Sequence, residues 1–390
     1  MKQFKLGLVI NPIAGIGGSV ALKGSDGVGI AEQAIALGAT AKANARASLA
    51  LEILLPYQDN LVIYTAADDM GECAARTLGF NTKVIYQPQH KVTTENDTEQ
   101  AVKVLIDESV DLLLFAGGDG TARNVCHIVA DKFPVLGIPA GCKIHSGVYA
   151  ITPKAAGRVV ELMITHQLVS LTDADVMDID ENLFRKGIVK AKRFGEMRVP
   201  SELRYIQAVK SGGKESDELV LQDIAADVIA KMDDELFIIG SGSTTAFLME
   251  ELALENTLLG VDAVCHQTLL ANDLTESQLW QLIADYSTEQ VKLVITLIGG
   301  QGHIFGRGNQ QLSPRVIRAI GKDNIMIIAT KAKLNALQAR PLIVDTGDSA
   351  LDIELSGCQS AIMSDRNNKE VNYKYLYQVE LINLTKLIWN

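Results

Sequence analysis

Short apolar runs alternate with amphipathic segments along the first part of the chain. The runs 6–10, 61–64, 83–86, 112–116 and 135–138 are typical of buried strands, and the segments 29–37, 46–55, 71–78 and 99–108 have helical spacing. Strands that alternate with helices predict a doubly wound parallel sheet. Ligands of such sheets bind outside the carboxyl ends of the strands, so the segments after each run are candidate sites.

The second half of the chain continues the alternation, with apolar runs at 236–239, 293–298 and 325–329. We predict an α/β fold, with a doubly wound parallel-sheet N-terminal domain and a second domain that has further α/β units and some antiparallel strands. A length of 390 residues fits two domains. We place the domains at residues 1–168 and 169–390.

A glycine turn with one carboxylate, Gly117-Gly118-Asp119-Gly120-Thr121, follows the run 112–116 and precedes a helical segment that includes Asn124. Glycines let backbone N–H groups approach a polyphosphate, and a helix N-terminus favours its negative charge. In such a turn, Asp119 is placed to hold Mg²⁺ or to take a proton from an attacking hydroxyl. The alternative is an ordinary strand-to-helix turn in which Asp119 caps the helix.

A second glycine loop, Asn11-Pro12-Ile13-Ala14-Gly15-Ile16-Gly17-Gly18, follows the strand-like segment 4–10. The cluster Lys23-Gly24-Ser25-Asp26-Gly27 comes soon after it. Together these residues form either a loop that covers the phosphates of a nucleotide, with Lys23 in contact with a phosphate, or a mobile surface loop. It is not a P-loop, because the chain has no Gly-Lys-Ser/Thr triplet here.

The pairing of these two loops resembles the NAD kinase and diacylglycerol kinase superfamily. The strings 23–27, 137–141 and 175–180 are similar to its ATP-NAD kinase branch, which includes proteins associated with acetoin operons. This resemblance implies transfer of a phosphoryl group from ATP to the adenosine 2′-hydroxyl of NAD, aided by Mg²⁺. It implies that Asp119 is the catalytic carboxylate, and that the nucleotide site contains Asn11, Pro12, Gly15, Gly17, Lys23, Gly117, Gly118, Gly120, Thr121 and Asn124. No metal ligands are assigned.

The loop 137–146 follows the next strand and contains Lys143 and His145. Diacylglycerol kinases have a Pro-x-Gly-Thr element followed by Asn-Asp, whereas this chain has Cys142, Ile144 and His145 at the corresponding places. Lys143 and His145 either contact phosphate or are solvated polar groups of a turn.

Two further glycine loops follow strand-like runs in the second half. Gly242-Ser243-Thr244-Thr245 resembles the Gly-Ser-Thr-Ala element of NAD kinases, and Asp262 follows at an interval that suits a ribose contact. The loop 299–309 contains Arg307, a candidate to stabilise charge on a transferred phosphoryl group. The alternatives are a helix-capping Ser/Thr cluster and a structured surface loop. The acidic segment 173–181 is expected to be a solvated antiparallel crossover rather than a ribose or metal site.

Composition narrows the class of protein. The net charge of −11 argues against binding to nucleic acid or an anionic membrane, and no apolar stretch is long enough to cross a bilayer. We find no signal peptide, and five cysteines without a C-x-x-C pair suggest reduced thiols. We expect a cytoplasmic homo-oligomer.

The sequence therefore predicts an ATP- and Mg²⁺-dependent kinase with NAD as the acceptor, bound in part by the second domain. Two alternatives stay open: a kinase of another lipid, sugar or small-molecule hydroxyl, and a nucleotide-binding regulator without turnover. The choice between ATP and polyphosphate as the donor is also open.

Overall fold

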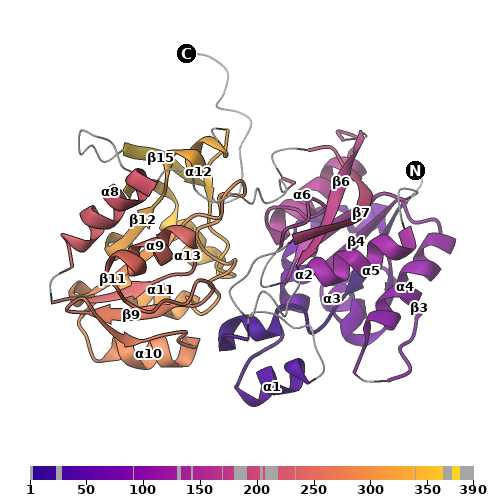
Figure 1. Cartoon of the computed structure of the whole chain (residues 1–390). Helices are drawn as coiled ribbons and strands as arrows, with labels where there is room; N and C mark the ends of the chain where they lie inside the picture. Colours follow the sequence, from indigo (N-terminus) through magenta and orange to yellow (C-terminus); the bar gives the residue numbers. More distant parts are fainter. Residues whose placement is uncertain are drawn as a thin grey trace, which may run out of the picture.

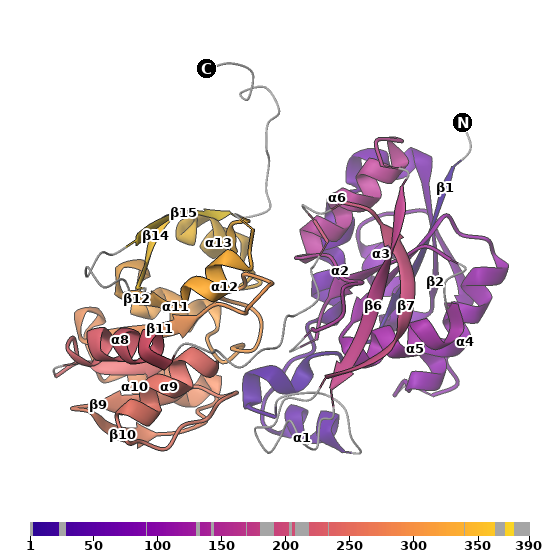
Figure 2. The same cartoon turned by 45° about the horizontal axis from the view of Figure 1, so that its top comes forward.

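The computed structural model describes residues 3–22, 29–90, 92–129, 133–141, 144–168, 170–179, 191–202, 205–206, 218–232, 234–338, 340–362 and 371–377. Figures 1 and 2 show two bodies side by side, the first built from the N-terminal half of the chain and the second from the C-terminal half. Lys23 and Lys143, two candidate phosphate contacts, lie outside the described residues.

The first body contains a parallel sheet of five strands in the order β3-β2-β1-β4-β5. Its strands are β1 (Phe4–Ile10), β2 (Leu61–Ala66), β3 (Thr82–Tyr86), β4 (Leu112–Gly117) and β5 (Val135–Pro139). The strand order reverses between β1 and β4, which makes their carboxyl ends the topological switch point of the sheet. The prediction of a doubly wound parallel sheet is confirmed.

Helices cover both faces of this sheet: α2 (Ala43–Glu52), α3 (Glu72–Thr77) and α6 (Pro153–Ile164) on one side, α4 (Glu95–Asp107) and α5 (Asp119–Val129) on the other. Leu8 of β1 belongs to the core with α2 and α6, and the adjacent Val9 belongs to the core with α4 and α5. Because both faces are buried, the strands are nearly continuous apolar runs. A short helix, α1 (Ile30–Ala36), packs with the 3-10 helix η1 (Ile16–Val20) in a small core of its own.

An antiparallel pair, β6 (Leu171–Ile179) and β7 (Ala191–Pro200), follows α6. Val176 of β6 and Met197 of β7 are buried in the same core as Val125 of α5. This pair therefore packs on the first body, although it lies beyond residue 168.

The second body contains a mixed sheet of eight strands in the order β10-β9-β8-β11-β12-β14-β15-β13. Four central strands, β8, β11, β12 and β14, are parallel, and antiparallel pairing occurs at β9, β10 and β15. The strands are β8 (Leu236–Ile239), β9 (Asp262–Cys265), β10 (Thr268–Ala271), β11 (Val291–Thr296), β12 (Ile325–Ile328), β13 (Leu342–Ile343), β14 (Gly357–Ile362) and β15 (Val371–Tyr377). The expected mixture of α/β units and antiparallel strands is confirmed.

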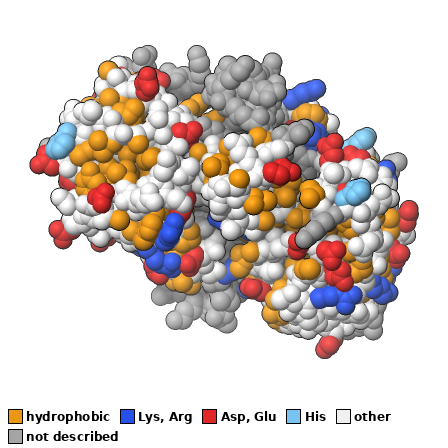
Figure 3. All heavy atoms as spheres, turned by 90° about the horizontal axis from the view of Figure 1, so that it is seen from below, with side chains coloured by type: hydrophobic (Ala, Val, Ile, Leu, Met, Phe, Trp, Pro, Cys, Tyr) orange, Lys and Arg blue, Asp and Glu red, His pale blue; other side chains and the backbone are white. Residues whose placement is uncertain are grey.

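Helices cover both faces of the central strands of this sheet as well. Helices α8 (Glu218–Ile229) and α9 (Ser243–Glu251) pack on one face, and α10 (Glu276–Ala284), α11 (Pro314–Ile320), α12 (Lys331–Asn335) and α13 (Ser349–Leu355) contribute to the core on the other. The remaining 3-10 helices are η2 (Leu55–Asn60), η3 (Asp68–Met70), η4 (Thr288–Gln290) and η5 (Lys322–Asn324). On the face shown in Figure 3, acidic and basic side chains are scattered among hydrophobic ones. Among the described residues, no helix combines the length and apolarity that crossing a bilayer requires.

Candidate active site

Three loops of the first domain meet at the carboxyl ends of β1, β4 and β5. The Asn11 amide at the end of β1 donates to Thr121 Oγ1 in α5 at 3.1 Å. The backbone N–H groups of Ala140 and Gly141, after β5, both donate to the carbonyl of Gly117, at 2.9 and 3.0 Å. The structure thus brings together Asn11, Gly117 and Thr121, which the sequence placed in one nucleotide site.

The glycines of these loops occur where one loop packs directly on another. Gly15 has a φ of +72°, and a Cβ there would lie only 2.2 Å from the carbonyl oxygen of Ala140. A Cβ on Gly118 would lie 3.2 Å from the Cα of Gly141. Gly118 is not among the positive-φ residues, so close approach rather than backbone conformation accounts for its glycine.

The other predicted residues of this site lie on the same three segments. Pro12 is in the turn after β1, Gly17 is buried in η1, and Gly120 and Asn124 are in α5. The N-terminal end of α5 therefore lies at the switch point. Helix N-termini in this position favour bound anions.

Asp119 is the first residue of α5, and its carboxylate is 6% exposed. Its Oδ2 accepts from the backbone N–H of His145 at 2.7 Å and lies 3.0 Å from His145 Nδ1. Its Oδ1 accepts from the backbone N–H of Ser146 at 3.1 Å and lies 2.7 Å from Ser146 Oγ. A carboxylate has about four lone-pair sites, so these contacts occupy Asp119 fully.

The hydrogen bonds of Asp119 affect whether the protein itself can bind the expected Mg²⁺ ion. In the part of the chain that the structure describes, no three His, Cys, Asp or Glu side chains are grouped as metal ligands. Both oxygens of Asp119 already accept hydrogen bonds from residues 145 and 146, so this carboxylate is not available to coordinate a metal ion directly. The described residues do not fit a protein-held Mg²⁺ ion. Mg²⁺ that arrives with nucleotide phosphates does not need such a cage.

His145 is 4% exposed, so it is not the solvated turn residue of the alternative interpretation. Its Nδ1 faces Asp119, and its Nε2 is buried without a hydrogen-bond partner among the described residues. The tautomer follows from the contact. A carboxylate only accepts, so Nδ1 carries the proton, and a neutral ring then has its lone pair on Nε2.

The loop 299–309 of the second domain lies against the first domain just beyond His145. Gln301 Nε2 donates to the carbonyl of Ile144 at 2.9 Å, and His303 Nε2 lies 3.0 Å from the carbonyl oxygen of Ile151. The Arg307 guanidinium also donates to the Ile151 carbonyl, at 3.0 Å. This loop is therefore part of the contact between the domains.

Arg307 is 3% exposed, and burial lowers its pKa to about 10. The negative charges of Asp345 and Asp119 act in the opposite direction and favour the charged guanidinium. Asp345 also forms an ion pair with Arg46, which is a second charged link between the domains. The pKa of His303 is well below its usual value because of burial and the positive charge of Arg307, so this imidazole is neutral.

The loop Gly242–Thr245 forms the start of α9 at the carboxyl end of β8. The Lys333 ammonium of α12 lies 2.6 Å from Thr244 Oγ1 and 3.4 Å from Ser243 Oγ. Thr245 Oγ1 donates to the carbonyl of Gly242 at 2.9 Å. Sequence reasoning missed Lys333, because a lone lysine about 90 residues downstream belongs to no motif.

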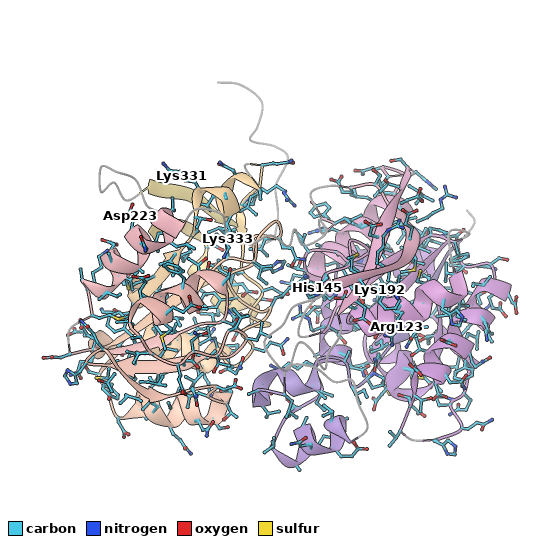
Figure 4. The ribbon with its side chains drawn as sticks, viewed as in Figure 1. Arg123, His145, Lys192, Asp223, Lys331 and Lys333 are labelled. Atoms are coloured by element: carbon cyan, nitrogen blue, oxygen red, sulfur yellow. The ribbon has the colours of Figure 1, made fainter. Side chains whose placement is uncertain are left out.

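Two acidic residues from the sequence analysis have structural partners. Asp262 accepts from the backbone N–H groups of Thr257 and Asp273, at 2.7 and 2.9 Å, and so holds two turns together. Asp178 in β6 is buried and accepts from Arg123 of α5 at 2.8 Å. Figure 4 shows Arg123 on the first domain, His145 where this domain faces the second, and Lys333 on the second domain.

Comparison with known proteins gives one clear family. Residues 6–168 match the model of the ATP-NAD kinase N-terminal domain, and residues 232–373 match the model of the ATP-NAD kinase C-terminal domain. No curated protein matches significantly. Among solved structures, one described as a candidate UDP-N-acetylglucosamine 2-epimerase from Listeria monocytogenes aligns at 13% identity with a TM-score of 0.23, over 91% of this chain and 82% of that one. So low a score carries no argument.

Proposed function

Because the chain belongs to the ATP-NAD kinase family, we propose that it transfers the γ-phosphoryl group of ATP to the adenosine 2′-hydroxyl of NAD, which yields NADP and ADP. One observation supports this above others. The loops after β1, β4 and β5 contact each other at the switch point of the sheet, where folds of this class bind ligands.

In this proposal the nucleotide phosphates lie along the loops that begin at Asn11 and Gly117. Glycines at positions 15 and 118 keep these loops close enough together for backbone groups to face a ligand. The N-terminal end of α5 then contributes its partial positive charge to a phosphate. Asp119 belongs to the catalytic machinery through the segment 144–146 that it holds.

The second domain supplies contacts to the acceptor in this proposal. Lys333 and the hydroxyls of Ser243 and Thr244 form a cationic polar group at the start of α9. Such a group suits the pyrophosphate of NAD, because an ammonium and hydroxyls donate to phosphate oxygens. Arg307 is buried against the Ile151 carbonyl, so we assign it to the domain contact rather than to the transferred phosphoryl group.

The test is an acceptor screen with the purified full-length chain. ATP and Mg²⁺ are supplied with NAD, NADH, a sugar or diacylglycerol in vesicles, and both ADP release and the phosphorylated product are measured. We expect NADP to form in proportion to ADP. Phosphorylation of another acceptor but not NAD would instead support a different hydroxyl kinase. Nucleotide binding without ADP release would support a regulator. A parallel reaction with polyphosphate identifies the donor.

A further inference from the structure

We propose that His145 is the group that takes the proton from the acceptor hydroxyl, and that Asp119 is the positioning residue that holds its ring. This inference rests on the proposed kinase function and deepens it. The proposal joins two residues that the chain separates by 26 positions, one at the start of α5 and one after β5. It assigns the base role to an imidazole that the sequence analysis connected only with phosphate contacts.

The Asp119 carboxylate has no free position for a proton. Its two oxygens have contacts with two backbone N–H groups, one hydroxyl and one ring nitrogen. A base must present an available lone pair to the proton that it abstracts, within about 2.6–3.2 Å of the donor oxygen. Asp119 presents none without breaking one of these contacts.

The His145 ring, in contrast, has one nitrogen available. Nδ1 points its proton at Asp119, so the neutral ring has its lone pair at Nε2. Within the described residues, Nε2 is buried and has no partner. A buried polar atom without a hydrogen-bond partner destabilises the fold, and a structural histidine avoids this by bonding through both ring nitrogens. Because the backbone N–H groups of residues 145 and 146 already anchor this segment to Asp119, its fold does not require the imidazole.

His145 lies next to both predicted substrate sites. Asp119 directly follows Gly117 and Gly118, so its partner His145 lies beside the glycine loops of the nucleotide site. Ile144, the neighbour of His145, accepts from Gln301 of the second domain. Figure 4 shows His145 at the side of the first domain that faces the second. A base at this position lies between the loops assigned to ATP and the domain assigned to the acceptor.

In the proposed reaction, the O–H bond of the 2′-hydroxyl breaks, and its proton moves to His145 Nε2. The hydroxyl oxygen forms a bond to the γ-phosphorus, and the bond from that phosphorus to the β-bridging oxygen breaks, leaving its electron pair on ADP. The imidazolium then stands beside the Asp119 carboxylate, which stabilises its charge, and loses the proton to water after product release.

His145→Asn separates the base from the structural contact. Its amide places a donor near the former Nδ1 and keeps the bond to Asp119, but it has no counterpart of Nε2. We expect kcat to fall by about 10²–10⁴-fold, with ATP and NAD binding by calorimetry close to wild type. In His145→Ala, added imidazole should restore part of the lost kcat. The matched control is His127→Ala, since His127 is also paired with a carboxylate, Glu99 Oε1 at 3.2 Å, but is exposed on α5.

The outcomes distinguish this inference from the proposed function. Wild-type turnover in His145→Asn, or no rescue of His145→Ala by imidazole, would overturn the base role while leaving the NAD kinase proposal intact. A wild-type protein that phosphorylates no hydroxyl would overturn both. If the variants do not fold, ¹⁵N NMR of the wild-type ring decides. We expect the proton on Nδ1, and a proton fixed on Nε2 of the neutral ring would contradict the proposal.

Discussion

The Arg307 guanidinium of the second domain donates to the Ile151 carbonyl of the first at 3.0 Å, although the two residues are 156 positions apart. Both groups are shielded from water, so this contact fixes the loop 299–309 against the segment that carries His145. The arrangement gives the loop a role in domain contact that its glycine content does not reveal.

Removal of this contact should lower stability. We expect Arg307→Ala to reduce the free energy of unfolding by about 1–3 kcal/mol, because the buried Ile151 carbonyl loses its bond to the guanidinium and the buried Asp345 carboxylate loses a nearby positive charge. The measurement is chemical denaturation. Arg76→Ala is the control, since Arg76 is exposed and its i,i+4 pair with Glu72 lies on the surface of α3, so its denaturation midpoint should change little. Unchanged stability in Arg307→Ala together with a specific loss of kcat would instead support contact with the transferred phosphoryl group.

Gly15 offers a test of the loop packing at the candidate site. Gly15→Ala should destabilise the protein more than Gly29→Ala does. Both glycines have positive φ, at +72° and +80°, but a Cβ at Gly15 meets the Ala140 carbonyl, whereas a Cβ at Gly29 has no atom of the described residues within 4 Å. The backbone strain is therefore matched, and the difference between the variants reports the contact. ATP affinity, measured by calorimetry, should fall only for Gly15→Ala; equal effects in both variants would mean that the loops do not need this close approach.

The group formed by Lys333, Ser243 and Thr244 is expected to affect the binding of NAD rather than the rate of phosphoryl transfer. Lys333→Met and Thr244→Ala should each raise KM for NAD while kcat stays near wild type, as expected when uniform binding is lost. Steady-state kinetics with varied NAD at saturating ATP measures this. Thr268→Ala is the control, because Thr268 is exposed on β10. An unchanged KM for NAD in both site variants would remove the second domain from acceptor binding.

The buried Asp352 carboxyl should make the free energy of unfolding depend on pH. Burial raises its pKa to about 6, above the unfolded value of about 3.9. The folded protein therefore binds more protons than the unfolded chain between these values, and this group stabilises less as the pH rises from about 4 to 6. Asp352→Asn should gain on the order of 2 kcal/mol relative to wild type over that window.

Denaturation of both proteins at several pH values measures this difference. Asp348→Asn serves as the control, because Arg318 lowers the pKa of Asp348 to about 2, and its difference from wild type should stay flat between pH 5 and about 7. A difference for Asp352→Asn that does not change with pH would show that its carboxyl is not perturbed by burial.

Much of the fold was predictable because its signals are local. Apolar runs of strand length, each followed by glycines, mark the carboxyl edge of a parallel sheet without reference to distant residues. The contact between Asn11 and Thr121 lies at this edge, where neighbouring parallel strands end side by side. The glycine turn was expected over residues 117–121, whereas in the structure Gly117 ends β4 and Asp119 already begins α5.

The side-chain partners were not predictable in the same way. Asp119 was interpreted as a carboxylate that holds Mg²⁺ or takes a proton, or as a helix cap, and nothing in the sequence indicated the donors from residues 145 and 146 that surround it. Lys333 reaches Thr244 only because β8 and β12 end at the same edge, which the spacing of residues does not encode. The packing of β6 and β7 on α5 depends on which surface this antiparallel pair contacts, and the amino-acid composition of the two strands does not indicate that surface.

The central claim is phosphoryl transfer from ATP to NAD by the site that contains Asp119. The most direct measurement is transfer of a labelled γ-phosphoryl group from ATP into NADP by the wild-type protein and by Asp119→Asn. We expect labelled NADP with the wild type and a rate about 10²–10⁴-fold lower with the variant. The variant should also unfold at a lower temperature, because an amide NH2 group replaces an oxygen that accepts from residues 145 and 146, so the rates are compared well below the melting temperatures of both proteins. Absence of labelled NADP with the wild type, or an equal rate with Asp119→Asn, would contradict the account.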